Sequence, residues 1–186
     1  MGGGSMARFF IALFLLVVAQ PVLANDWQAL RAPGAVVLMR HALAPGTGDP
    51  GHFDLARCET QRNLDARGRA QAQAIGQMLA AQGIGFDHVF SSQWCRCRDT
   101  AQLLELGPVD DQPALNSFFQ NYGAEAAQTQ AAMRLIQENA GQRLFLVTHQ
   151  VNIRALTGEG ARSGEMIVAQ LREGRLQVTG RVMIAP

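Results

Sequence analysis

The sequence predicts an α/β protein, a three-layer sandwich with a mostly parallel central sheet flanked by helices. Residues 35–39 form a continuous apolar run and 143–148 (RLFLVT) are another largely apolar segment, as is typical of parallel strands buried on both faces. Segments with helical spacing alternate with these runs, as they do in α/β domains. The chain has 186 residues and is 48% hydrophobic, which is enough for one well-buried core.

The expected elements follow from the spacing of apolar residues and from the turn residues between them. Ala72, Ile75 and Leu79 recur at helical spacing, and Gly83 stands where a helix C-cap belongs. The dipeptide Glu173-Gly174 predicts the turn of a β-hairpin. In chain order we expect a strand at 35–39, a loop rich in Gly and Pro at 42–54, a helix at 65–82, a strand at 88–90, a helix at 94–106, an irregular segment at 108–121, a helix at 125–140, a strand at 143–148, a short helix at 151–156, and hairpin strands at 166–171 and 176–184.

The N-terminus has the features of a secretory signal peptide. Arg8 is followed by an apolar run at 9–19, which is too short for an ordinary membrane-spanning helix, and small residues precede a cleavage point after Ala24. We therefore expect an exported, periplasmic protein with no stable membrane span after cleavage; an uncleaved membrane anchor is the alternative. The predicted organisation is an expression scar or misassigned start at 1–5, a signal peptide at 6–24 and a single domain at 25–186.

The charged residues narrow the possible functions. The net charge is only +1, so no basic field suggests a nucleic-acid partner. All sixteen basic residues are Arg, so Schiff-base lysine chemistry and a P-loop lysine are both excluded.

The sequence contains three cysteines, Cys58, Cys95 and Cys97. They form no CxxC motif, which argues against a structural zinc site. In an exported chain we expect Cys58 to form a disulfide with either Cys95 or Cys97.

Two of the four histidines directly follow the buried strands. His41 and His149 should therefore project into one crevice, because ligands of open α/β sheets bind beyond the carboxyl ends of the strands. Arg40 directly precedes His41. A neutral imidazole can attack phosphorus, and arginine forks suit the phosphoryl oxygens, so this set favours phosphoryl transfer. With arginines supplying the positive charge, we expect no metal and no other cofactor.

Four segments in order resemble signatures of the histidine phosphatase superfamily, which is related to phosphoglycerate mutase. Together they extend from Val36 to Arg154, over most of the predicted mature chain. They are the strand with its RH pair at 38–42, where Ala42 replaces the family's glycine; the helix start LDARGRAQA at 64–72; the segment SSQWCRCRDTA at 91–101; and LVTH at 146–149, followed by Arg154.

The resemblance implies roles for particular residues. His41 would be the nucleophile, and Arg40, Arg96 and His149 would form the phosphate pocket. Weaker candidates for phosphate or substrate binding are Arg62 and Asn152, the latter because it fits the phytase-like branch.

Both familiar positions of the family's general acid lack a carboxylate here. The neighbourhood of one is 115–119, LNSFF, and Gln150 follows the second histidine. Asp54 and Glu59 are the candidate replacements, and Asp110 and Asp111 are weaker ones. Alternatively, the leaving group needs no acid, as with a phosphohistidine.

The resulting expectation is a metal-independent phosphatase that acts on a phosphomonoester or phosphoramidate. The short chain and the signal peptide favour a bulky substrate of the cell envelope, such as a phosphorylated glycan or a phosphoprotein. Two alternatives belong to other classes. One is a catalytically silent phosphate-binding module. The other is a metallohydrolase that uses His41, His149, His52 and Asp54.

Overall fold

A computed structural model describes residue 1 and residues 26–184. The predicted signal peptide at 6–24 lies outside the described residues. Within the described ranges, no helix combines the length and apolar character needed to cross a membrane.

A six-stranded sheet in the order β3-β2-β4-β1-β5-β6 forms the centre of the domain. The pairs β1–β4, β2–β4 and β2–β3 are parallel, whereas β1–β5 and β5–β6 are antiparallel. The predicted α/β class with a mostly parallel sheet is therefore confirmed. The strands are β1 (Ala35–Arg40), β2 (His88–Ser91), β3 (Val109–Asp111), β4 (Leu144–Thr148), β5 (Met166–Arg172) and β6 (Arg175–Val182).

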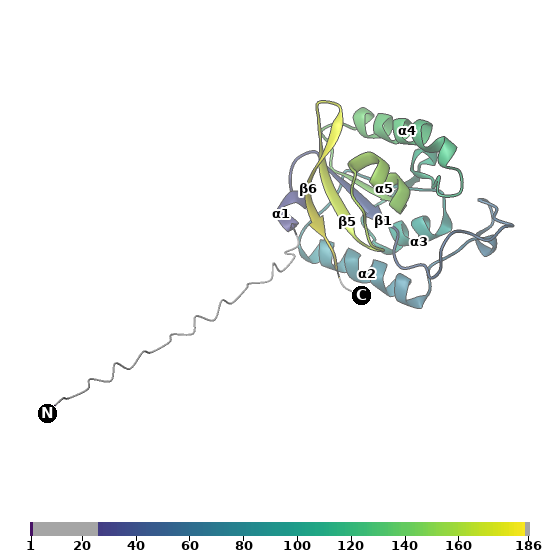
Figure 1. Ribbon diagram of the computed structural model, residues 1–186, viewed down its shortest axis with the longest axis horizontal. Helices are drawn as coiled ribbons and strands as arrows, with labels where there is room; N and C mark the ends of the chain where they lie inside the picture. The colour runs from purple at the N-terminus through teal and green to yellow at the C-terminus, as the bar shows by residue number, and fades with distance from the viewer. Residues whose placement is uncertain (2–25, 185–186) are drawn as a thin grey trace.

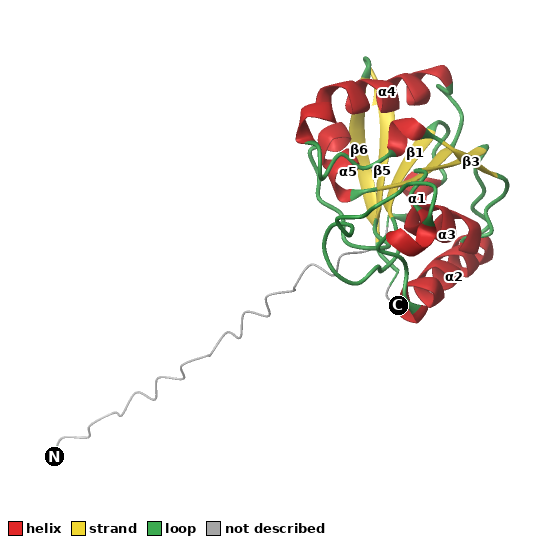
Figure 2. Ribbon diagram, turned by 90° about the vertical axis from the view of Figure 1, so that its right-hand side faces the viewer, coloured by secondary structure: helices red, strands yellow, loops and turns green. Residues whose placement is uncertain are grey.

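Helices cover both faces of this sheet (Figures 1 and 2). Val37 and Met39 of β1 face the core shared with α1, α2 and α3, whereas Val36 and Leu38 face the core shared with α4 and α5. This alternation follows from the two-residue period of a strand, and it explains why the central strands are apolar throughout. The helices are α1 (Trp27–Leu30), α2 (Ala66–Ala81), α3 (Cys95–Leu103), α4 (Glu125–Glu138) and α5 (Gln150–Thr157), with 3-10 turns η1 (Cys58–Thr60), η2 (Pro113–Leu115) and η3 (Tyr122–Ala124).

The register of the central strands positions the two histidines. Arg40 at the end of β1 pairs with Thr148 at the end of β4, and the strands are parallel. His41 and His149 are the next residues of their strands, and the His41 amide donates to the Thr148 carbonyl at 3.0 Å. The two histidines therefore leave the same edge of the sheet side by side.

Most predicted elements lie within a few residues of their expected bounds. Strand β3 was missed, because three residues with two exposed carboxylates give no detectable alternation at a sheet edge. The four-residue α1 was also not predicted. The hairpin turn is confirmed at Glu173 and Gly174, which both have positive φ.

Candidate active site

A cavity of about 480 Å³ opens beyond the carboxyl ends of β1, β2 and β4. Its lining is basic and aromatic, and Asp49 is its single carboxylate among the described residues. The lining residues are Arg40, His41, Gly46, Thr47, Gly48, Asp49, Phe53, Arg62, Trp94, Arg96, Ser117, Phe119, Gln120, Asn121, Tyr122, His149, Gln150, Val151 and Arg154.

His41 is held as a neutral imidazole with one defined tautomer. Its Nδ1 lies 2.7 Å from the Ala42 carbonyl oxygen, which can only accept, so Nδ1 carries the proton. The lone pair is therefore on Nε2, which no described residue hydrogen-bonds. Burial, followed by the nearby charge of Arg96, lowers the pKa of His41 well below its usual value. His41 thus has the protonation state of a nucleophile.

His149 lies beside His41, with the ring centroids 5.6 Å apart in an edge-to-face arrangement. Arg96 Nη2 donates to its Nδ1 at 3.4 Å, so Nε2 carries the proton and donates to Ser92 Oγ at 2.9 Å. Ser92 in turn donates to Asn116 Oδ1 at 3.2 Å. Burial and the charge of Arg96 lower the pKa of His149 well below its usual value. This network fixes the ring against the cavity wall.

Arg96 forms a buried ion pair with Asp49. Nη1 contacts Oδ1 at 2.7 Å and Nη2 contacts Oδ2 at 3.2 Å, and the two side chains are only 3% and 4% exposed. Asp49 also accepts hydrogen bonds from the Arg62 amide and from Trp94 Nε1, each at 3.0 Å. Arg96, which the sequence predicted to bind phosphate, therefore has both Nη atoms of its guanidinium group in contact with a carboxylate.

Arg40 and Arg62 complete the positive wall of the cavity. Arg40 Nη1 donates to the Ala161 carbonyl at 3.2 Å, and Arg62 donates to the carbonyls of Ala44 and Gly48. The Nε atoms of Arg40 and Arg96 are buried without a partner in the described part of the chain. Buried donors of this kind are suited to a ligand with several acceptor oxygens.

The start of α2 holds the loop that follows His41. Gln71 Oε1 accepts from the Leu43 amide at 2.9 Å, and its Nε2 donates to the Ser163 carbonyl at 3.0 Å. Gly68 packs so closely that a Cβ there would lie 1.9 Å from the Leu43 carbonyl oxygen. The glycine and glutamine of the family-like segment at 64–72 therefore position the backbone next to His41.

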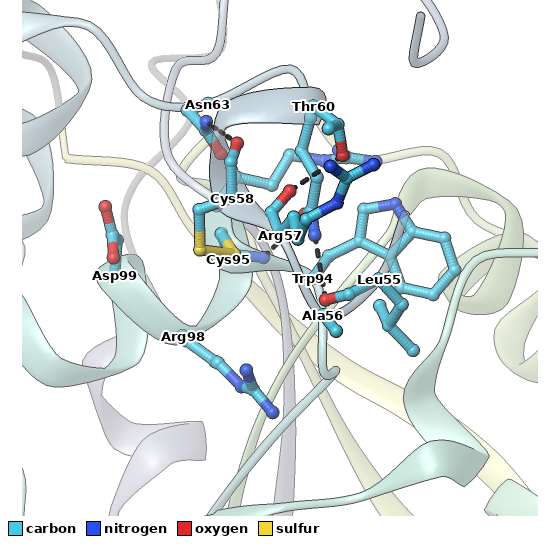
Figure 3. The surroundings of a disulfide bond; sticks show 12 residues. Leu55, Ala56, Arg57, Cys58, Thr60, Asn63, Trp94, Cys95, Arg98 and Asp99 are labelled. Carbon is cyan, nitrogen blue, oxygen red and sulfur yellow. Dashed lines mark hydrogen bonds between the residues drawn. A yellow bond between two sulfur atoms is a disulfide. The ribbon is translucent and has the colours of Figure 1, made fainter. Parts of the chain in front are cut away.

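A disulfide joins Cys58 to Cys95, with the Cα atoms 5.7 Å apart (Figure 3). It connects the loop after His41 to the first residue of α3, one residue before Arg96. Of the two pairings left open by the sequence, the structure selects Cys95. Cys97 is a buried free thiol, and burial raises its pKa to about 12. A neutral thiol of this kind is a poor nucleophile.

The structure brings together the four main candidates Arg40, His41, Arg96 and His149, together with Arg62. It does not bring Asp54 or Glu59 to the cavity. Asp54 instead pairs with Arg57 at 2.9 Å, because a turn at 54–57 closes around its carboxylate, and Glu59 is exposed on η1.

The weaker acid candidates and Asn152 also lie elsewhere. Asp111 pairs with Arg98 at 2.5 Å on the edge strand β3, and its neighbour Asp110 is exposed. Asn152 is buried and donates to the Asn116 carbonyl at 2.9 Å, so it supports the cavity wall and does not line it. The helix that carries Asn152 was predicted, whereas the strand that carries Asp110 and Asp111 was not, and the direction of each side chain is set by tertiary packing.

Sequence reasoning missed Asp49 and Ser92. Asp49 stands between Gly48 and Pro50, where an aspartate is typical of a turn. The useful signal was its place in the loop that directly follows His41.

The residues of the alternative metallohydrolase site do not come together, because neither His52 nor Asp54 lines the cavity. Within the described residues, no group of three or more His, Cys, Asp or Glu side chains is arranged to hold a metal ion.

Comparisons with known proteins agree with this geometry. Residues 36–119 match the model of the histidine phosphatase superfamily (branch 1). The chain is 30% identical over 90 residues to the mitochondrial serine/threonine-protein phosphatase Pgam5 of Drosophila ananassae. That alignment covers 48% of this chain and 28% of the curated relative, so the chain spans less than a third of the relative's length.

Solved structures share the fold at low sequence identity. The protein histidine phosphatase SixA in complex with tungstate superposes with a TM-score of 0.58 at 17% identity, over 79% of this chain and 95% of SixA. A phosphoserine phosphatase from Entamoeba histolytica gives 0.60 at 15% identity, over 81% and 97% of the two chains. A mycobacterial glucosyl-3-phosphoglycerate phosphatase in complex with VO3 gives 0.60 at 17% identity, over 80% and 98%.

The family match, the fold and the paired histidines at the ends of β1 and β4 lead to one conclusion. Residues 36–119 resemble the histidine phosphatase superfamily, and the fold is the one seen in solved phosphatases such as SixA.

Proposed function

We propose that this protein is a metal-independent phosphatase that transfers a phosphoryl group to His41 and then to water. The single observation that carries this proposal is the fixed tautomer of His41, whose Nε2 lone pair adjoins a cavity lined by four arginines. A neutral imidazole is the nucleophilic form, and arginine forks stabilise the charge on the phosphoryl oxygens.

We also propose that the substrate is a phosphomonoester or phosphoramidate attached to a larger molecule. A volume of about 480 Å³ suits one phosphorylated sugar or side chain. Phe119 and Tyr122 are 43% and 58% exposed where they line the cavity, so they can contact parts of a substrate that extend outside it. These features support a phosphorylated glycan or phosphoprotein as the substrate.

We further propose that the protein acts in the cell envelope. The predicted signal peptide supports export, and a Cys58–Cys95 disulfide is compatible with an oxidising compartment. Fractionation of cells that express the full chain tests this proposal. Recovery of unprocessed protein from the cytoplasm would contradict it.

The experiment that tests the catalytic proposal measures hydrolysis of p-nitrophenyl phosphate and of a phosphoramidate by the purified protein, with and without EDTA. We expect activity that EDTA leaves unchanged, competitive inhibition by vanadate or tungstate, and an acid-labile phosphoenzyme after rapid quenching. Binding of tungstate without any turnover would instead identify a silent phosphate-binding module. Activity lost in EDTA and restored by a divalent metal would identify a metallohydrolase.

A further inference from the structure

We propose that Asp49 is the proton donor to the leaving group, and that in the free protein it serves as the counterion of Arg96. This inference rests on the proposed phosphatase function and names a further catalytic residue for that reaction. It begins from an observation: the cavity contains one carboxylate, and that carboxylate is bound to the arginine expected to hold phosphate.

The four Nη hydrogens of Arg96 are all engaged in the free protein. Nη1 contacts Asp49 Oδ1 and the Arg62 carbonyl, at 2.7 and 3.2 Å, and Nη2 contacts Asp49 Oδ2 and His149 Nδ1, at 3.2 and 3.4 Å. A phosphoryl group that uses these nitrogens must therefore displace some of these contacts. Asp49 is the contact with the same charge as the phosphoryl group, so it is the one that repulsion displaces.

Displacement changes the protonation of Asp49. Burial alone would raise its pKa, but hydrogen bonds from Arg96, the Arg62 amide and Trp94, together with the charge of Arg96, lower the pKa below its usual value. When a phosphoryl dianion neutralises Arg96, the effect of burial is no longer outweighed. Asp49 then favours the neutral carboxylic acid, which is the form that donates a proton.

The position of Asp49 suits a donor to the leaving group. Arg96 Nη2 lies between Asp49 and His149, and His149 lies beside the nucleophile His41. Asp49 and His149 therefore share one guanidinium nitrogen, so the carboxyl group lies near the ring that adjoins His41. Gly46 and Gly48 precede it with positive φ, so two of the three residues before Asp49 carry no Cβ to restrict a small movement.

The two half-reactions balance with Asp49 as the proton carrier. In the first, His41 Nε2 forms a bond to phosphorus, the P–O bond breaks with its electron pair on the leaving oxygen, and the Asp49 acid protonates that oxygen. In the second, Asp49 carboxylate takes a proton from water as the oxygen attacks phosphorus. The P–N bond then breaks, its electron pair returns to Nε2, and hydrogen phosphate leaves with Asp49 again protonated.

The test compares the parent with Asp49→Asn and with Asp54→Asn, a matched control in the same loop that lies outside the cavity. Each protein is assayed on phenyl phosphate, which has a poor leaving group, and on p-nitrophenyl phosphate, which departs without a proton. We expect Asp49→Asn to lose about 10²–10⁴-fold in kcat/KM on phenyl phosphate and to stay within about tenfold of the parent on p-nitrophenyl phosphate. Asp54→Asn should match the parent on both substrates.

Equal loss on both substrates, or no loss on phenyl phosphate, would overturn the role of Asp49 and leave it as a counterion only. If Asp49→Asn does not fold, the parent alone provides the test, because a donor makes kcat/KM nearly independent of leaving-group acidity across a series of aryl phosphates. A steep dependence in the parent would overturn the inference. A parent that hydrolyses none of these substrates would instead refute the proposed phosphatase function.

Discussion

The imidazole rings of His41 and His149 meet edge to face, 5.6 Å apart, although the residues come from strands far apart in the sequence. They meet because β1 and β4 are parallel neighbours that end at the same level of the sheet. One ring has its lone pair on Nε2 and the other has it on Nδ1, because each is oriented by a different partner. The two histidines are therefore suited to different tasks.

Replacement of His41 by Asn should abolish turnover, because no other described cavity residue offers a neutral imidazole with its Nε2 lone pair free of a protein partner. Phosphoenzyme should be trapped in the parent after acid-free quenching and should be absent from the variant. Thermal denaturation with and without tungstate provides the control for folding and for an intact anion site. Turnover by the variant within about tenfold of the parent would contradict the mechanism.

Replacement of Arg96 by Ala should destabilise the protein as well as inactivate it. It leaves the buried Asp49 carboxylate without its cation, which typically costs about 3–5 kcal/mol in the free energy of unfolding. The double variant Arg96→Ala with Asp49→Asn should recover part of this loss. Arg69→Ala, which breaks a largely exposed pair with Asp99, should cost at most about 1 kcal/mol. Urea denaturation measures all three, and equal stability of Arg96→Ala and Arg69→Ala would contradict the interpretation.

Gly68→Ala should destabilise the protein and lower activity, because its Cβ would lie 1.9 Å from the Leu43 carbonyl oxygen. Backbone movement there shifts the loop next to His41, and overpacking of this kind typically costs about 1–3 kcal/mol. Gly51→Ala is a suitable control, since a Cβ at that exposed position meets nothing within 4 Å. Melting temperature and kcat together test this expectation, and similar values for both variants would refute it.

Loss of the disulfide should loosen the cavity wall. The bond closes a loop with a sequence separation of 37, for which the chain-entropy model gives about 3–4 kcal/mol of stabilisation. Cys58→Ser should therefore lower the melting temperature, and treatment of the parent with a reductant should lower it by a similar amount. The reductant should not change the variant further. An unchanged melting temperature in Cys58→Ser would show that the bond contributes little.

The stability of the protein should fall as the pH drops below about 6.5. The folded protein holds His41 and His149 with pKa values well below normal, whereas the unfolded chain takes up protons near the usual value. Stability is therefore greatest above the unfolded pKa and is lost as the pH falls toward the folded pKa values, by up to about 1.4 kcal/mol per pH unit for each histidine. Urea denaturation from pH 7.5 to 5 should show this slope, reduced in His41→Asn and unchanged in a variant of the exposed His52.

Local sequence patterns were sufficient to predict the fold class, the order of the main elements and the position of His41 at the end of a central strand. The apolar run at 35–39 and the largely apolar segment at 143–148 mark the central strands, and their ends mark the sites of His41 and His149. These features depend on local periodicity, and parallel strands necessarily bring their carboxyl ends to one edge. The short edge strand β3 was missed because three residues carry too little periodic signal.

Packing between distant segments selects which carboxylate enters the cavity and which cysteine pairs with Cys58. Asp49 and Asp54 lie in the same polar loop, yet one is buried on Arg96, 47 residues away, and the other is bound to Arg57. Cys95 and Cys97 are two residues apart on one helix, so only Cys95 lies next to Cys58. In each case the path of a loop over the sheet decides the contact, and that path depends on hydrogen bonds between distant segments, which local sequence patterns do not encode.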